Sequence, residues 1–132
     1  MKKIIHTSNA PEAVGPYSQA VEINGMLFIS GQVPLDPDTA DLVEEDIKIQ
    51  TERVMENIAA ILKAAGYDFN DVVKTTCLLT DISNFKPMNE VYARYFRETP
   101  PARAAFGVKS LPLGALIEIE TIAIKEKSSV NL

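Results

Sequence analysis

An arginine and a pair of glutamates in the sequence suit acid–base chemistry on a small carboxylate. Arg103 stands in PPARAAFGV, between two prolines and a run of small and apolar residues. Glu118 and Glu120 alternate with isoleucine in IEIETIAI. A planar guanidinium binds a carboxylate through two parallel hydrogen bonds, which a lysine cannot do. A partly buried glutamate has a raised pKa, which suits it to proton transfer near neutral pH.

The segment around Arg103 is predicted to be a β-strand, in which side chains point alternately to opposite faces. Arg103, Ala105 and Gly107 then share one face, cleared of large side chains as the floor of a ligand site would be. We expect Phe106 and Val108, on the other face, to point to the core. An ion pair of Arg103 with one of the 18 acidic residues is the alternative, and the spacing alone favours it.

The glutamates of the last strand share one face with Ile122 and Ile124. An acid with such apolar neighbours would titrate unusually. A solvated sheet edge is an equally good interpretation of the same pattern.

Two loops at strand ends add candidate ligand contacts. GPYSQA places Tyr17 in a turn, and FISGQVP places Ser30 and Gly31 at the end of a strand. Loops on a rigid sheet often carry ligand contacts, and a glycine lets a ligand or water approach backbone N–H groups. Tyr17 is equally consistent with a core tyrosine and Ser30 with a turn residue. Arg103, Glu118, Tyr17 and Gly31 indicate a catalytic site only when they are taken together.

Length, composition and charge are those of a single globular domain and exclude several classes of protein. The chain has 132 residues, 46% of them hydrophobic and 23% charged, which predicts one globular domain over residues 1–132. Cys77 and His6 are the only residues of their kinds, so one chain cannot form a disulfide or a Cys/His zinc site, and we expect Cys77 in the core. A net charge of −5 argues against nucleic acid. No long apolar run or secretory signal is present, which predicts a cytoplasmic protein with no membrane span.

The elements that must position these residues follow from local patterns. Asn24-Gly25 between VEI and MLFIS predicts a β-hairpin, and apolar residues at helical spacing over 47–65 predict a helix that ends at Gly66. DVVKTTCLL is predicted to be a buried strand, and Ser83 is expected to cap a second helix that presents an aromatic stripe. AAFGV and LIEIETIAI complete the order β-β-α-β-α-β-β, with a short first strand at KIIHT. The predicted fold class is α+β, with both helices on one face of the sheet.

The segments GPYSQA, FISGQVP, VVKTTCLLTDI, PPAR and LPLGALIEIETIA occur in this order over nearly the whole chain. They resemble the reactive-intermediate deaminase A (RidA) family. The resemblance implies a chorismate-mutase-like fold (bacillus type), assembled as a homotrimer whose sheets face a central barrel and whose ligand clefts lie between subunits. It also implies a hydrolase acting on C–N bonds without a cofactor. Enamines and imines such as 2-aminoacrylate, 2-iminobutanoate and 2-iminopropanoate, which pyridoxal-phosphate enzymes release, would become 2-oxo acids and ammonia.

The resemblance also implies roles for single residues. Arg103 is similar to the family arginine that clamps the substrate carboxylate, and Glu118 to the residue that holds or activates the attacking water, with Glu120 as its structural neighbour. Tyr17 is similar to a tyrosine that lines the cleft from the adjacent subunit. The positions that line or support this cleft are Ser30, Gly31 and Asn89.

The sequence departs from many family members directly after the arginine. Where they read Arg-Ser-Cys, this chain reads Arg103-Ala104-Ala105, so the thiol is missing. Ala105 can contribute only backbone groups and shape to a substrate site, which excludes a cysteine nucleophile at this position. Gly107 stands where an acidic residue is common, which would alter the cleft or the trimer interior.

Two other functions compete with deamination. The first is a non-catalytic module that binds small carboxylates or 2-oxo acids and regulates a partner, because Arg103 would serve binding without turnover. The second is an RNA-acting or translation-inhibiting role, which has been attributed to some relatives of the family. The acidic net charge argues against the second.

Overall fold

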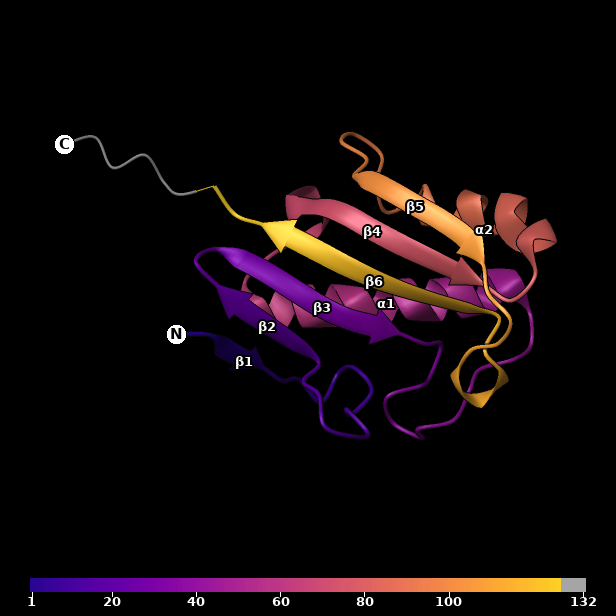
Figure 1. The fold of residues 1–132 in the computed structure, drawn as a ribbon, viewed down its shortest axis with the longest axis horizontal. Helices are drawn as coiled ribbons and strands as arrows, with labels where there is room; N and C mark the ends of the chain where they lie inside the picture. The colour runs from indigo at the N-terminus through magenta and orange to yellow at the C-terminus, as the bar shows by residue number, and fades with distance from the viewer. Residues whose placement is uncertain (127–132) are drawn as a thin grey trace.

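The computed structural model describes residues 1–126, which form a six-stranded sheet covered on one face by two helices (Figure 1). The helices are α1 (Ile47–Ala65) and α2 (Phe85–Tyr92). The strands are β1 (Lys3–Ile5), β2 (Ala20–Ile23), β3 (Met26–Gln32), β4 (Val72–Leu79), β5 (Ala102–Gly107) and β6 (Ile117–Ile124). The predicted α+β class and the order of the elements are confirmed. No helix within residues 1–126 is both long enough and apolar enough to span a membrane.

The last strand of the chain lies in the middle of the sheet. The strand order is β1-β2-β3-β6-β4-β5, so β6 is inserted between the hairpin β2–β3 and the pair β4–β5. Every neighbouring pair is antiparallel except β4 and β5, which are parallel and therefore need the crossover that contains α2. This order places Glu118 of β6 beside the end of β3, where Ser30 and Gly31 lie.

Local signals explain the first helix and the hairpin. Asp46 accepts hydrogen bonds from the backbone N–H groups of the first turn of α1, and Gly66 ends the helix in the left-handed conformation with φ 82°. Asn24 and Gly25 both have positive φ, as the turn of a tight hairpin requires. Buried apolar residues of α1, among them Val54 and Ile58, pack onto the sheet. Both predicted elements are confirmed.

The predicted cap of the second helix was wrong. Asp81, not Ser83, is the capping acceptor, because its Oδ1 accepts from both the backbone N–H (2.9 Å) and the hydroxyl (2.7 Å) of Ser83. The hydroxyl of Ser83 is used in this contact. A short 3-10 turn (Ile82–Asn84) therefore precedes α2, and Asn84 makes no side-chain cap bond.

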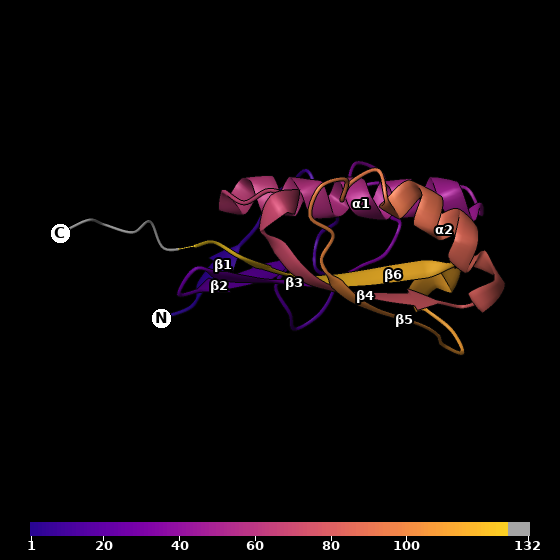
Figure 2. The same ribbon diagram turned by 90° about the horizontal axis from the view of Figure 1, so that it is seen from above.

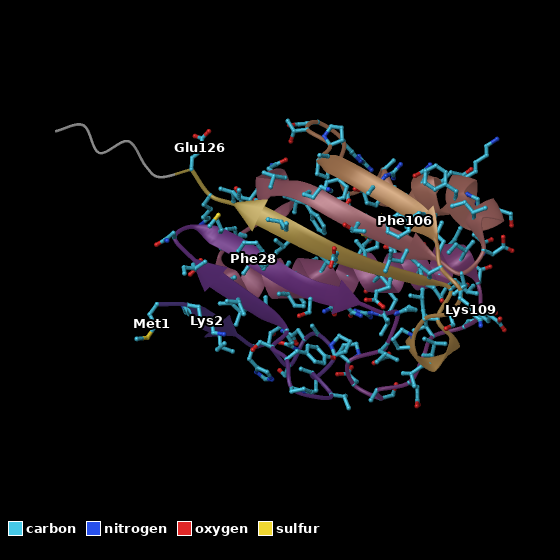
Figure 3. All side chains as sticks on the ribbon, viewed as in Figure 1. Met1, Lys2, Phe28, Phe106, Lys109 and Glu126 are labelled. Atoms are coloured by element: carbon cyan, nitrogen blue, oxygen red, sulfur yellow. The ribbon has the colours of Figure 1, made fainter. Side chains whose placement is uncertain are left out.

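The helices lie on one side of the sheet, and no helix of residues 1–126 covers the other side (Figure 2). This helix-free face carries exposed aromatic side chains: Phe28 is 42% exposed and Phe106 is 50% exposed (Figure 3). The prediction that Phe106 points to the core was therefore wrong. The alternation along β5 is as expected, but Arg103 and Ala105 take the helix side, where two rings of α2 lie against the Arg103 guanidinium.

Candidate ligand-binding site

Arg103 lies on the edge strand β5 and is held by one face of α2. Its Cζ lies 5.1 Å from the ring centroid of Phe85 and 4.9 Å from that of Tyr92. Its NH1 group donates a 2.7 Å hydrogen bond to Oδ1 of Asn89. These three partners follow one another at helical spacing, so a single helix face presents two cation–π surfaces and one acceptor. The guanidinium is thus oriented by neutral groups.

The charge of Arg103 has no acidic partner within the described part of the chain. Across residues 1–126, no carboxylate oxygen lies within 4.0 Å of its nitrogens. The spacing favoured an ion pair at the surface or at a subunit interface. Within residues 1–126 of one chain this ion pair is not formed, and an ion pair across a subunit interface stays a prediction. One N–H of the guanidinium serves Asn89, and a guanidinium carries further donors that suit an incoming carboxylate.

Tyr92 connects Arg103 to the core. Its hydroxyl forms a 2.7 Å hydrogen bond with Oγ1 of Thr75, which lies opposite Arg103 in the parallel β4–β5 pair. Burial raises the pKa of Tyr92, so the ring stays neutral beneath the guanidinium. The sequence predicted an aromatic stripe on this helix but not the contact of Phe85 and Tyr92 with Arg103. Their spacing around Asn89 was the available signal.

Ala105 lies half-buried on the helix side and is opposite Cys77 in the neighbouring strand. Burial raises the pKa of the Cys77 thiol to about 11, although the nearby Arg103 charge opposes the shift. The thiol is fully buried and stays protonated at neutral pH. Cys77 is therefore a core residue, as predicted, and does not replace the cysteine that is missing at position 105.

Glu118 and Gly31 form a second group on the helix-free side. A Cβ built on Gly31 would overlap Oε2 of Glu118 and would lie 2.9 Å from its Cδ. The carboxylate therefore occupies the space that only a glycine leaves open. Burial, followed by the charge of Glu120, raises the pKa of Glu118. Glu120 on the same face is exposed, so the two acids differ in environment despite their alternation.

The loop that carries Tyr17 is fastened to the strand end beside Gly31. The hydroxyl of Ser30 donates a 2.6 Å hydrogen bond to the carbonyl of Ser18, and the N–H of Ser30 donates to the carbonyl of Gln19 at 2.9 Å. Tyr17 itself is 53% exposed, and its hydroxyl accepts from the N–H of Val14. It is not a core tyrosine, and its ring is available to a ligand or to another chain.

The structure brings the predicted residues together in two separate groups. Arg103 and Asn89 lie on the helix side, whereas Gly31 and Glu118 lie on the helix-free side. Glu118 is opposite Leu78 in β4, and Leu78 is opposite Phe106 in β5. Arg103 and Phe106 are three positions apart, so their side chains point to opposite faces of the strand. One chain alone does not assemble a site from both Arg103 and Glu118.

Gly31→Ala is expected to fold and to displace the Glu118 carboxylate. The φ of Gly31 lies outside the left-handed region, so alanine is tolerated by the backbone, and the end of a flexible glutamate side chain moves more easily than a strand. We expect kcat of a reaction that uses the Glu118 carboxylate to fall about ten- to a hundredfold, because misplacing a catalytic group by about 1 Å has an effect of that order. Gly107→Ala is a control for the fold alone, because a Cβ there would meet its nearest atoms at 3.8 and 3.9 Å. Wild-type kcat in Gly31→Ala would contradict the role given to this contact.

Comparisons with known proteins identify the family. The sequence model described as Endoribonuclease L-PSP matches residues 7–125. A RutC family protein of Pyrococcus horikoshii is 57% identical over 126 residues, which cover 96% of this chain and all of that protein. A mouse protein named 2-iminobutanoate/2-iminopropanoate deaminase is 49% identical, with 95% of this chain and 93% of that protein covered.

The fold is also shared with solved structures of this family. The crystal structure of Escherichia coli TdcF with bound serine superposes with a TM-score of 0.90 at 40% identity, over 94% of this chain and 99% of that one. Other relatives carry the names of regulators and endoribonucleases, so names within the family differ. The match over almost the entire chain shows that the protein belongs to the Endoribonuclease L-PSP family, which includes the Rid proteins.

Proposed function

We propose that the protein is an imine and enamine deaminase, which hydrolyses 2-iminopropanoate, 2-iminobutanoate and 2-aminoacrylate to 2-oxo acids and ammonia. The observation that carries this proposal is the guanidinium of Arg103, which is stacked and oriented by α2 but has no acidic partner in residues 1–126. The name of the mouse relative and the serine bound to the Escherichia coli relative support a small substrate with a carboxylate.

The proposed reaction adds water across the C=N bond. Arg103 holds the substrate carboxylate through paired hydrogen bonds, and Glu118 orients a water and takes its proton as the oxygen bonds to the imine carbon. Glu118 then returns the proton to the nitrogen, which gives a carbinolamine. Glu118 next takes the proton of its new hydroxyl group and passes it to the nitrogen, so that the C=O bond forms as the C–N bond breaks and ammonia leaves the 2-oxo acid. Free imines already hydrolyse in water, so positioning and charge stabilisation suffice, and we propose that no cofactor takes part.

We propose that the site is completed between copies of the chain in a homotrimer. This arrangement is supported by the placement of Arg103 and Glu118 on opposite faces of one chain. It is also supported by the exposed rings of Phe28 and Phe106, since a second copy would remove them from water. Arg103 and Asn89 of one copy would then face Gly31 and Glu118 of the next, with Tyr17 at the rim of the cleft.

The chemistry of the substrates suggests where the enzyme acts. Pyridoxal-phosphate enzymes that eliminate water from serine or threonine release 2-aminoacrylate or its four-carbon homologue, which tautomerise to imines. We therefore propose a functional link to such enzymes, in which this protein removes the reactive products. A cytoplasmic location stays a prediction from the sequence.

A small-carboxylate binding module is the second candidate, and Ala105 favours it. This position offers no side-chain group for proton transfer, and one relative carries the name of a regulator. Such a module would bind 2-oxobutanoate through Arg103 and would show no turnover. Binding with no hydrolysis of any imine would select this candidate over the deaminase.

The test is suppression of a trapped imine. An amino acid oxidase generates 2-iminobutanoate from 2-aminobutanoate, semicarbazide traps it, and active protein lowers the amount of semicarbazone. We expect the wild-type protein and the control Arg97→Ala, which alters an exposed arginine outside the site, to lower the signal equally. Arg103→Ala should leave the signal high. A wild-type protein that suppresses no semicarbazone from several amino acids would contradict the deaminase proposal.

A further inference from the structure

One buried amide fastens the loop that carries Tyr17. The loop joins β1 to β2 over residues 6–19, and the side chain of Gln19 at its end is only 3% exposed. Oε1 of Gln19 accepts from the N–H of Thr7 at 2.8 Å. Its Nε2 lies within hydrogen-bonding distance of three carbonyls, those of Thr7 (3.0 Å), Ala10 (3.3 Å) and Pro11 (2.8 Å), which share its two N–H donors. The amide is thus bonded on both of its ends to the first half of the loop.

The orientation of this amide follows from its partners. The N–H of Thr7 needs an oxygen opposite it, and the three carbonyls need an NH₂ group, so only one orientation satisfies all four contacts. Glutamate would keep the acceptor but would place a carboxylate oxygen against the carbonyls. Leucine or methionine would leave buried backbone groups without partners, which is costly.

Gln19 also joins the loop to the strand end at Gly31. Its own carbonyl accepts from the N–H of Ser30 at 2.9 Å, while the adjacent carbonyl of Ser18 accepts from the Ser30 hydroxyl at 2.6 Å. Tyr17 lies two residues before Gln19 in the chain. The backbone N–H of Tyr17 donates to the carbonyl of Gly15, a contact within the same turn. Gln19 therefore links residues 7–11, the Tyr17 turn and the Ser30–Gly31 corner at one point.

We propose that Gln19 is a positioning residue that holds Tyr17 in its ligand-binding position relative to Gly31 and Glu118. This inference rests on the proposed function, because Tyr17 lines the cleft there. Tyr17 is a wall of the site and does not touch the reacting atoms, so its displacement weakens the binding of substrate and transition state alike. Such a change raises KM and leaves kcat nearly unaltered.

The test compares Gln19→Met with wild type by the trapped-imine assay and by calorimetric binding of 2-oxobutanoate. We expect the loop of Gln19→Met to hold Tyr17 in its binding position for about a tenth of the time. KM for 2-iminobutanoate then rises about tenfold, and affinity for 2-oxobutanoate falls by the same factor. The control is Val54→Ala, which removes buried side-chain volume from α1 and lowers the melting temperature without removing a hydrogen bond of Gln19. It should keep the wild-type KM.

A double-variant cycle separates positioning from a general loss of stability. On a Tyr17→Ala background, Gln19→Met should change neither KM nor affinity further, because the residue through which it acts is gone. Gln19→Glu, which keeps the bond from Thr7, should lie between wild type and Gln19→Met, and it serves if Gln19→Met does not fold. In wild-type protein, the amide hydrogen of Thr7 should exchange slowly with solvent.

The outcomes distinguish the two proposals. Wild-type KM and affinity in both folded Gln19 variants would overturn the positioning role, and so would equal, additive effects with and without Tyr17. A wild-type protein that binds 2-oxobutanoate but turns over no imine would overturn deamination. The role of Gln19 would then be judged on affinity alone. Rapid exchange of the Thr7 amide would also overturn the inference, because the bond to Gln19 would not be maintained in solution.

Discussion

Arg103→Ala is expected to lower kcat/KM for 2-iminobutanoate by about two to four orders of magnitude, because two charge-assisted hydrogen bonds of about 1.5–3 kcal/mol each are lost. The side chain is exposed at a sheet edge, so the fold should survive the change. The effect should appear in the affinity for 2-oxobutanoate as well, since the carboxylate is present in substrate and product alike. The measurements are the trapped-imine assay and calorimetry.

Arg103→Lys is the matched control for charge. Lysine keeps the positive charge but loses the planar fork and the stacking on the rings of Phe85 and Tyr92. We expect it to recover only a small part of the lost activity. Full activity in the lysine variant would contradict bidentate binding, and unchanged kcat/KM in the alanine variant would contradict the clamp altogether.

Glu118→Gln is expected to lower kcat by about two to four orders of magnitude, the usual contribution of a general acid–base group, while affinity for 2-oxobutanoate changes little. Glutamine keeps the size and can still contact a water, but it cannot accept the proton. Single-turnover kinetics with enzyme in excess would separate this loss from substrate binding. Glu120→Gln is the matched control, because Glu120 is exposed on the same face and should retain most of the activity. Retained kcat in Glu118→Gln would contradict the proposed role.

The pH dependence of activity should report the same residue. Burial, followed by the Glu120 charge, raises the pKa of Glu118, so its active carboxylate form is lost at a higher pH than in an ordinary glutamate, whose pKa is about 4.3. Wild-type kcat/KM should therefore fall as the pH decreases through this raised pKa. The falling limb should be absent from the residual activity of Glu118→Gln. Because 2-iminobutanoate also titrates, the comparison between variants is the informative measurement.

The raised pKa of Glu118 also affects stability, with a pH dependence opposite to that of activity. A folded-state pKa above the unfolded-state value means that the fold favours protonated Glu118. The contribution of this residue to stability is fully present below the unfolded pKa and is lost as the pH rises through the folded pKa. At pH 7, Glu118→Gln should therefore have a melting temperature equal to or above that of wild type. A lower melting temperature would show that the ionised form makes favourable contacts in the assembled protein.

Local signals in the sequence sufficed for the elements but not for the faces of the sheet. Asn24-Gly25 and Gly66 have backbone conformations that their residue types favour, so the hairpin and the end of α1 were predictable. The orientation of β5 was not, because the larger side chain, Phe106, points away from the helices. Which face of β5 points to the helices depends on where the aromatic residues of α2 pack, and this packing is part of the tertiary structure.

The candidate site shows the same division. Arg103, Asn89, Gly31 and Glu118 were predictable as residue types at strand ends and by resemblance to a family. Their separation into two groups was not predictable, because it depends on the insertion of β6 between β3 and β4. The sequence did not predict the role of Gln19. Its side-chain hydrogen bonds join residues 8 to 12 positions apart across a loop without regular structure, which no local pattern indicates.

The placement of Arg103 and Glu118 on opposite faces of one chain predicts complementation between mutant alleles. In the proposed trimer each cleft takes its arginine from one copy and its glutamate from another, so two defective chains can complement each other. In trimers assembled at random from equal amounts of Arg103→Ala and Glu118→Gln chains, about a quarter of the clefts would receive both intact side chains. An allele that lacks the clamp would thus be partly rescued by an allele that lacks the acid, although neither alone supports activity.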